Sequence, residues 1–133
     1  MPARILVIED DPNTLELMIY LLTAFGHTVL TAGNGIAGLA VASAEKPDLI
    51  ACDIQLPHLD GYGVARALAK DLDLSSIPLI AVTAFSMVGD REAILSAGFD
   101  GYISKPIAPE SFAEQLDRYL PPALHARRVA AKG

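Results

Sequence analysis

The chain has 133 residues, of which 52% are hydrophobic and 20% are charged, and its formal net charge is −6. This length fits one domain with a single core and is too short for two ordinary domains, while the apolar content excludes a disordered chain. No apolar run is long enough to cross a bilayer, and the acidic residues that follow the first apolar run exclude a signal peptide.

Charge and cysteine content restrict the partners and the compartment. The C-terminal stretch PPALHARRVAAKG is basic, so the rest of the chain holds 7 basic and 16 acidic residues, a net charge of −9. Such an acidic body repels a phosphate backbone, so we expect no binding of nucleic acid by the domain itself, and we expect no membrane association. The single cysteine, Cys52, lies in an apolar run and can form no internal disulfide, which favours a packing role and a reducing cytoplasm.

The first part of the chain predicts a strand, an acidic loop and a helix. Residues 4–8 are a short apolar run, and three acidic residues follow it. Asp11 and Pro12 are typical of an N-cap and a first helical position, and Gly26 is typical of the residue after a helix.

The same alternation of strand and helix recurs along the rest of the chain. The expected strands are 27–32, 49–53, 79–83 and 101–104, and the expected helices are 36–44, 61–70, 89–97 and one that carries Phe112, Leu116 and Leu120.

Five strands that alternate with five helices predict an α/β fold with a doubly wound parallel sheet. The strands are nearly continuous apolar runs, so helices should cover both faces of the sheet. The strand at 27–32 ends without a charged residue, which fits an edge strand. In such sheets the functional residues lie just beyond the carboxyl ends of the strands, at the point where the strand order reverses.

Polar residues mark the ends of four of the five expected strands. Glu9 and Asp10 follow the first strand, and Asp53 ends the third. Thr83 ends the fourth strand, and Lys105 follows the fifth. Any one of these residues alone has an ordinary structural role as a cap, a turn residue, a strand residue or a surface lysine. Their convergence on one edge of the sheet instead predicts a functional site.

These residue types suit phosphoryl transfer. The three carboxylates offer the hard oxygen ligands that Mg²⁺, or another divalent cation such as Mn²⁺, prefers, and a cation would relieve their mutual repulsion. Asp53 can act as a carboxylate nucleophile toward a phosphoryl group and form an aspartyl-phosphate. Lys105 supplies a positive charge for the phosphoryl oxygens, and Thr83 supplies a hydroxyl donor.

Four segments make the chain resemble a response-regulator receiver domain, namely ILVIEDD, ACDIQLPHLDGYG, AVTAFSMVGDRE and AGFDGYISKPI. The resemblance spans residues 5–107, and the spacing fits the family, with 43 residues from Asp10 to Asp53, 30 from there to Thr83 and 22 from there to Lys105. It implies the flavodoxin-like strand order 2-1-3-4-5. The phrase TAFSMVGDRE and the lack of an output domain are most similar to stand-alone receivers of bacterial cell-division and polarity circuits.

The resemblance also implies which residues bind the metal and the phosphoryl group. It makes Glu9 and Asp10 the acidic pair and Asp53 the phosphoacceptor, which also binds the metal. Gln55 would offer its backbone carbonyl to the metal. The chain departs from the family pattern in two small ways, because Glu9 replaces a commoner Asp and Leu56 stands where Met is frequent.

The resemblance also implies a second group of residues, which would respond when Asp53 is phosphorylated. Thr83 matches the switch hydroxyl and Tyr102 the aromatic switch position, while Ala84 would leave room beside the phosphoryl group. Lys105 would contact the phosphate, and its peptide bond to Pro106 is often cis in this family.

The expected function is a phosphorylation-dependent switch in two-component signalling, with no turnover of a separate substrate. A sensor histidine kinase or a histidine phosphotransfer protein would donate the phosphoryl group, and a downstream protein would read the changed surface around the fourth helix and the fifth strand. Phe85, two residues after Thr83, is expected to shield the acyl phosphate and slow its hydrolysis. The receiver domain should span residues 1–121, followed by a short, loosely ordered basic tail at 122–133.

Two other functions compete with this interpretation. An Mg²⁺-dependent phosphohydrolase also uses an aspartyl nucleophile, but Gln55 replaces the second acid of its Asp-x-Asp pattern, and the chain has no cap domain. The other alternative is an interaction module of the same fold that is not phosphorylated, and the complete set of site residues argues against it.

Other residues give no sign of a second site. His27, His58 and His125 lack metal-ligand spacing, and Gly33-Asn34-Gly35 is interpreted as a turn rather than a nucleotide loop.

Overall fold

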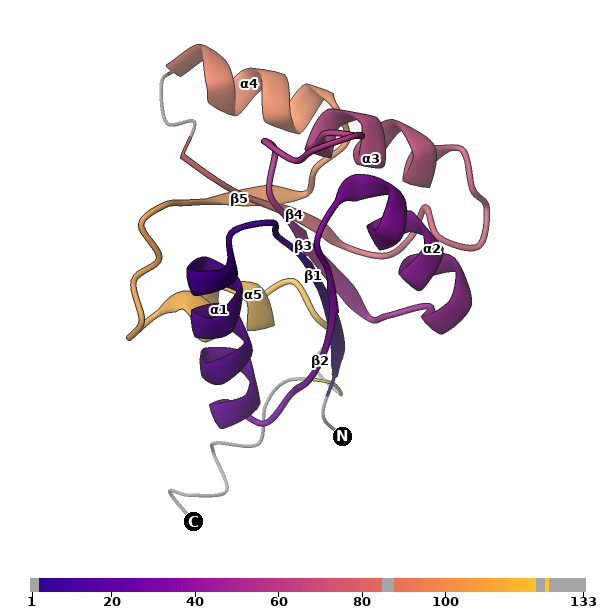
Figure 1. Ribbon diagram of the computed structural model, residues 1–133. Helices are drawn as coiled ribbons and strands as arrows, with labels where there is room; N and C mark the ends of the chain where they lie inside the picture. The colour runs from indigo at the N-terminus through magenta and orange to yellow at the C-terminus, as the bar shows by residue number, and fades with distance from the viewer. Residues whose placement is uncertain (1–2, 85–87, 122–123, 125–133) are drawn as a thin grey trace.

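The computed structural model describes residues 3–84, 88–121 and 124. The strands in these residues are β1 (Arg4–Ile8), β2 (Thr28–Ala32), β3 (Leu49–Cys52), β4 (Leu79–Thr83) and β5 (Gly101–Ser104). They form one parallel sheet in the order β2-β1-β3-β4-β5 (Figure 1). This order confirms the predicted doubly wound α/β fold, and the reversal of strand order lies between β1 and β3.

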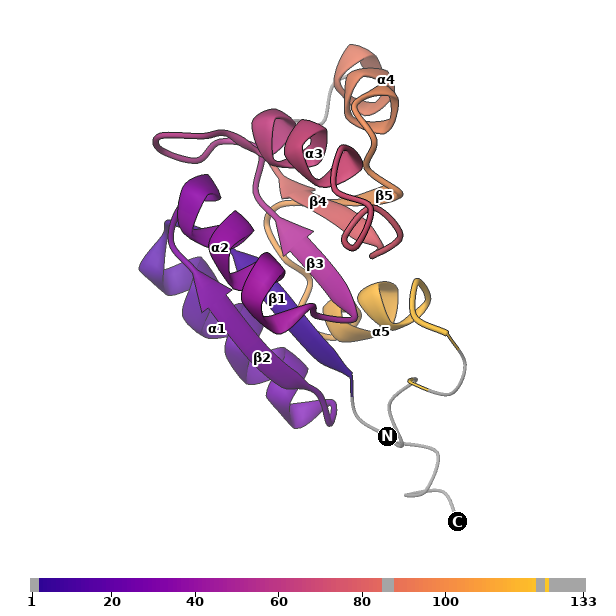
Figure 2. The same cartoon turned by 90° about the vertical axis from the view of Figure 1, so that its right-hand side faces the viewer.

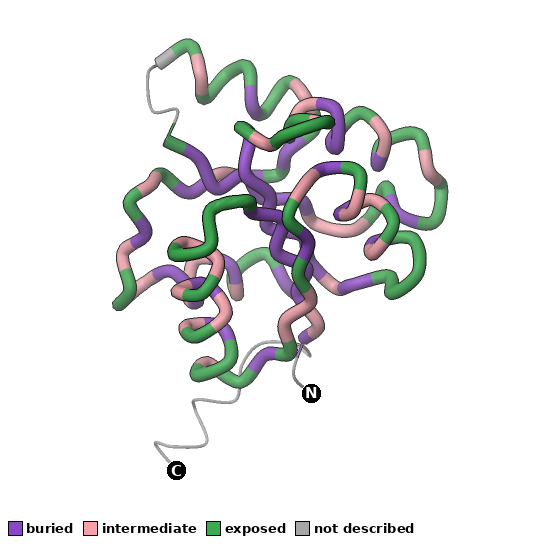
Figure 3. The backbone as a smooth tube through the Cα atoms, viewed as in Figure 1, coloured by how far each residue is buried: buried purple, intermediate pink, exposed green. Residues whose placement is uncertain are grey.

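Helices cover both faces of the sheet. Helices α1 (Pro12–Ala24) and α5 (Phe112–Asp117) lie on one face, and α2 (Gly35–Glu45), α3 (Gly61–Ala69) and α4 (Val88–Ser96) lie on the other (Figures 1 and 2). The middle strands β1, β3 and β4 are therefore buried along nearly their whole length (Figure 3). This arrangement explains why their sequences are continuous apolar runs without alternation.

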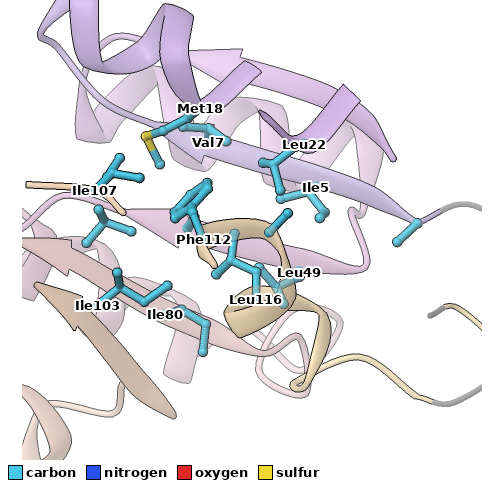
Figure 4. Close-up of a cluster of buried hydrophobic side chains, with 14 of the residues drawn as sticks. Ile5, Val7, Met18, Leu22, Leu49, Ile80, Ile103, Ile107, Phe112 and Leu116 are labelled. Carbon is cyan, nitrogen blue, oxygen red and sulfur yellow. The ribbon is translucent and has the colours of Figure 1, made fainter. Parts of the chain in front are cut away.

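The sheet separates two clusters of buried apolar side chains. One cluster lies on the side of α1 and α5 and includes Met18, Leu22, Phe112 and Leu116 (Figure 4). The other lies on the side of α2, α3 and α4. Successive residues of β1 alternate between the two clusters, as the pleat of a strand requires.

Side-chain caps hold the first turns of three helices that begin at the carboxyl edge of the sheet. Asp11, Asn34 and Asp60 each accept a hydrogen bond from the backbone N–H three residues on, at 2.9, 2.8 and 2.9 Å respectively. Pro12 occupies the first position of α1, as the sequence predicts. The helix starts are thus fixed close to the strand ends that they follow.

The elements agree with the predicted boundaries to within one residue, except at the last helix. Helix α5 ends at Asp117, and Leu120 lies beyond it in a turn where its N–H donates to the Asp117 carbonyl at 3.1 Å. Pro121 follows directly and has no N–H with which to continue a helix. Leu120 is nevertheless buried in the cluster on the α1 and α5 side.

Most of the predicted basic tail, residues 122–123 and 125–133, lies outside the described residues. The limit of the domain at residue 121 and the loose order of the tail therefore stay predictions. Leu124 packs against the α1 and α5 cluster, and its N–H donates to the Pro121 carbonyl at 2.8 Å. In the part of the chain that the structure describes, no helix is both long and apolar enough to pass through a bilayer.

Candidate functional site

Backbone hydrogen bonds join the strand ends at the carboxyl edge of the sheet. The N–H of Asp53 donates to the carbonyl of Ile8 at 3.0 Å, and the N–H of Lys105 donates to the carbonyl of Thr83 at 2.9 Å. These bonds extend the parallel pairing one residue past β3 and β5. The positions of Asp53 and Lys105 relative to the neighbouring strands are therefore set by the sheet itself.

The side chain of Lys105 lies between two carboxylates. Its Nζ is 2.9 Å from Asp53 Oδ2 and 2.9 Å from Glu9 Oε1. Glu9 and Asp53 expose only 1% and 6% of their surface, so both carboxylates are largely removed from water. Burial by itself lowers the pKa of Lys105, but the hydrogen bonds and the attraction of the two carboxylates outweigh it and raise the pKa overall. Lys105 is therefore a permanent positive charge at this edge.

At Glu9, in contrast to Lys105, burial has a larger effect on the pKa than the neighbouring groups do. Burial raises the pKa of its carboxyl group, and Lys105 and the N–H of Asp11, which donates to Oε2 at 3.1 Å, offset only part of this rise. Apart from its ion pair with Lys105, the buried Oε1 of Glu9 has no hydrogen-bond partner among the described residues. A buried carboxylate oxygen with this unused capacity is a suitable ligand for a cation.

An acidic cluster surrounds the ion pairs of Lys105. One carboxylate oxygen each from Glu9, Asp10 and Asp53 lies within 4.8 Å of the other two. Asp10 is exposed whereas Glu9 and Asp53 are buried, so the cluster is open to solvent on the side of Asp10. Three carboxylates this close repel one another, and their oxygens are the donors that Mg²⁺ prefers. The residues present thus fit a hard divalent cation.

The loop after β3 holds the carboxylate of Asp53 in place. The N–H of Gln55 donates to Asp53 Oδ1 at 3.1 Å, so one carboxylate oxygen is held by the backbone and the other by Lys105. Cys52 points to the other face, where it is fully buried in the cluster on the α2, α3 and α4 side, and this burial raises the pKa of its thiol above its usual range. The structure thus confirms the packing role predicted for Cys52.

The two predicted switch residues lie on neighbouring strands. Thr83 ends β4 and is fully buried, while Tyr102 lies on β5 and packs partly buried against the α2, α3 and α4 cluster. The guanidinium carbon of Arg91, on α4, lies 5.9 Å from the centre of the Tyr102 ring. Sequence reasoning did not anticipate Arg91, because its contact with Tyr102 joins two elements.

Three further expectations concern residues near this edge. The Lys105–Pro106 peptide bond is cis, as the family pattern implies. Ala84 is exposed directly after β4. Phe85, the residue expected to shield the acyl phosphate, lies outside the described residues.

The two described histidines, His27 and His58, are not part of the acidic cluster, and His125 lies outside the described residues. His58 is an exposed loop residue with a φ of 68°. His27, in contrast, is buried at the other end of the sheet, where its Nε2 lies 3.0 Å from Asp117 Oδ1 and its Nδ1 accepts a hydrogen bond from the N–H of Ala3 at 3.2 Å. Sequence reasoning missed this arrangement because a lone histidine at the start of an edge strand carries no signal of its partners.

The chain belongs to the response regulator receiver domain family, whose model matches residues 5–117. The fold, the strand order and the acidic cluster with its lysine at the carboxyl edge agree with this assignment. The protein is thus a receiver of two-component signalling.

Its similar relatives include polar-differentiation response regulators. The chain is 42% identical over 120 residues to the protein DivK of Brucella anthropi, an alignment that covers 90% of this chain and 98% of the relative. It is 40% identical, with the same coverage, to DivK of Brucella ovis. These matches agree with the resemblance to stand-alone receivers of cell-division and polarity circuits.

Solved structures of receiver domains are also similar to this chain. A receiver domain of a signal transduction histidine kinase from Syntrophus aciditrophicus matches with a TM-score of 0.80 and 33% identity, covering 87% of this chain and 88% of that one. The receiver domain of a sensor histidine kinase from Pseudomonas aeruginosa matches with a TM-score of 0.82 and 32% identity, covering 90% of this chain and 98% of that one. The Pseudomonas structure holds a magnesium ion coordinated in its active-site cleft.

Proposed function

We propose that Asp53 accepts a phosphoryl group from a phosphohistidine and that the receiver thereby changes the surface it offers to a partner. One observation carries this proposal. The carboxylate of Asp53 lies at the carboxyl edge of the sheet, 2.9 Å from the Lys105 ammonium and inside a cluster of three carboxylates. A buried nucleophile beside a fixed positive charge is what transfer of an anionic group requires.

Each contact of Asp53 has a role in the transfer. An oxygen of Asp53 forms a bond to phosphorus as the bond from phosphorus to the donor histidine nitrogen breaks, and the electron pair of that bond stays on the nitrogen. The N–H of Gln55 holds Asp53 Oδ1 and so orients the carboxylate. The backbone N–H of Lys105 donates a hydrogen bond to β4, which fixes the backbone of Lys105. Its ammonium group can therefore neutralise the phosphoryl oxygens without a rearrangement of β5.

A divalent cation fits the proposed reaction. Glu9, Asp10, Asp53 and the backbone carbonyl of Gln55 would hold Mg²⁺ or Mn²⁺ at this edge. When bound, the cation supplies positive charge between the carboxylates and a phosphoryl oxygen. The magnesium-bound receiver domain from Pseudomonas aeruginosa supports this part of the proposal.

Thr83 and Tyr102 are the proposed switch residues. The hydroxyl of Thr83 would turn toward the phosphoryl group, and the ring of Tyr102 would move into the space released. Tyr102 is half-buried on β5 beside α4, so its movement would alter the surface formed by these two elements.

The partners follow from this chemistry. A sensor histidine kinase or a histidine phosphotransfer protein would donate the phosphoryl group, in the cytoplasm, and a downstream protein would bind the changed surface. Apart from assisting its own phosphorylation and dephosphorylation, the receiver would turn over no separate substrate. The phosphohydrolase alternative would require an acid near Asp53 in the place of Gln55, whose exposed side chain is an amide.

Intact mass spectrometry after incubation with acetyl phosphate tests the proposal. We expect one phosphoryl adduct on the wild type in the presence of MgCl₂, and none in EDTA or on Asp53→Asn. Asp73→Asn is the matched control, since Asp73 is an exposed aspartate outside the cluster, and this variant should be modified like the wild type. A folded wild type that gains no adduct would favour the unphosphorylated interaction module.

A further inference from the structure

Leu59, in the loop between β3 and α3 (residues 53–60), lies directly against the first residue of α2. Gly35 is the first residue of α2 and is buried. A Cβ atom at Gly35 would lie 2.0 Å from the carbonyl oxygen of Leu59 and 2.9 Å from its carbonyl carbon. Backbone atoms cannot turn aside as the end of a long side chain can, so any side chain at Gly35 must displace the loop.

The loop is held at Leu59 from a second direction. A Cβ atom at Gly63, in the first turn of α3, would lie 2.3 Å from Leu59 Cδ1. Leu59 therefore lies between two glycines, one on α2 and one on α3. The ends of the loop are also joined, because the N–H of Gly61 donates to the carbonyl of Ile54 at 2.8 Å. We therefore expect a displacement of Leu59 to be passed along this short loop.

The same loop orients Asp53. Gln55 lies four residues before Leu59, and its N–H donates to Asp53 Oδ1 at 3.1 Å. A displacement of Leu59 by a side chain at Gly35 would therefore reach the Gln55 amide, and through it the carboxylate of Asp53.

We propose that Gly35 is a positioning residue for Asp53. It permits the close approach of the Leu59 carbonyl to α2, and this approach sets the loop in the place from which Gln55 holds the acceptor carboxylate. The functional part of the inference rests on the proposed phosphorylation of Asp53, whereas the structural part, a shift of the Gln55 amide, does not.

Local helix preference predicts the opposite effect of a substitution. Alanine is favoured over glycine inside a helix, and the Asn34 cap of α2 stays intact in Gly35→Ala. If only the helix mattered, this variant would be at least as stable and as active as the wild type.

The test compares Gly35→Ala with two controls. Gly33→Ala places the same methyl group two residues earlier, where a Cβ has nothing within 4 Å. Leu116→Ala opens a hole in the α1 and α5 cluster, on the other face of the sheet, and so lowers stability without contact with the loop. The measurements are urea unfolding, the ¹⁵N–¹H shift of the Gln55 amide without metal, and the rate of modification by acetyl phosphate with MgCl₂.

We expect Gly35→Ala to shift the Gln55 amide and to slow modification about tenfold to a hundredfold, as displacements near 1 Å do at reacting groups. Gly33→Ala should leave both unchanged. Leu116→Ala should unfold at lower urea but keep the Gln55 amide in place and the wild-type rate under conditions where it is folded.

An unmoved Gln55 amide in folded Gly35→Ala, or a wild-type rate of modification, would overturn the inference. If Gly35→Ala does not fold, Leu59→Ala takes its place, since removing the side chain between the two glycines should loosen the loop and give the same two changes. A wild type that is not modified would overturn the proposed function instead, and the Gln55 amide would still decide whether Gly35 sets the loop.

Discussion

Lys105 compensates two buried negative charges with one side chain. It contacts Asp53 and Glu9 at equal distances, and the burial of Glu9 raises the pKa of that carboxyl even with the lysine present. The burial of these carboxylates therefore costs electrostatic free energy, and the buried charges lie around Asp53, the group that is proposed to react.

We predict that Lys105→Met lowers the free energy of unfolding by about 1–3 kcal/mol, because two buried carboxylates lose their charged partner. Added MgCl₂ should restore part of the loss, since the same carboxylates are its proposed ligands. Urea unfolding with and without MgCl₂ measures both effects. Lys70→Met is the control, because Lys70 is exposed at the end of α3 and its loss should change little. Equal stability of the two variants would show that Lys105 does not compensate the cluster.

At the scale of elements, a helix with a side-chain cap follows each of β1, β2 and β3. Asp60 joins the loop after β3 to α3, because it is the last residue of that loop and caps α3 by accepting from the N–H of Gly63 at 2.9 Å. Helix α3 has nine residues, so its first turn is a large part of it.

We predict that Asp60→Ala costs about 1 kcal/mol of unfolding free energy, as loss of an N-cap does. Asp60→Asn keeps a side-chain oxygen at the cap and should stay within a few tenths of a kcal/mol of the wild type, since both residues cap well. Both values come from urea denaturation. If the two variants lost equal stability, the charge of Asp60 rather than its capping bond would be responsible.

Much of the fold and the site could be predicted from particular residues. Asp11-Pro12 and Gly26 delimit α1, and the apolar runs with polar ends place Asp53 and Lys105 at one edge. These features are local, or depend only on the rule that parallel strands end at the same edge.

The contacts between elements could not be predicted in the same way. The approach of Gly35 to Leu59, the ring contact of Arg91 with Tyr102 and the burial of His27 each join residues that the sequence separates. No period or motif encodes such pairs. The end of α5 was placed wrongly for a related reason, since Leu120 is buried by the core without belonging to the helix.

At the scale of the whole molecule, His27 joins the two ends of the described chain. It follows α1, accepts from the N–H of Ala3 just before β1, and pairs with Asp117 at the end of α5. The acidic cluster around Asp53 lies at the opposite edge of the sheet. We therefore expect a change at His27 to leave the reaction at Asp53 unaffected.

We predict that His27→Phe loses about 1–3 kcal/mol of unfolding free energy, because an aromatic ring still fills the site while the buried N–H of Ala3 loses its acceptor. The rate of modification by acetyl phosphate should equal that of the wild type at temperatures where both are folded. His58→Asn is the control for an exposed histidine and should match the wild type in both measurements. A slower modification of His27→Phe would show that the two ends of the sheet are coupled.

The measurement that tests the central claim most directly is the identification of the residue that carries the phosphoryl group. The wild type is incubated with acetyl phosphate and MgCl₂ and treated with sodium borohydride, which reduces an aspartyl-phosphate to homoserine, and its peptides are sequenced by mass spectrometry. We predict homoserine at position 53 and aspartate at positions 10, 11 and 60. Homoserine at another position, or none at position 53 in protein shown to be modified, would contradict the assignment of Asp53 as the acceptor.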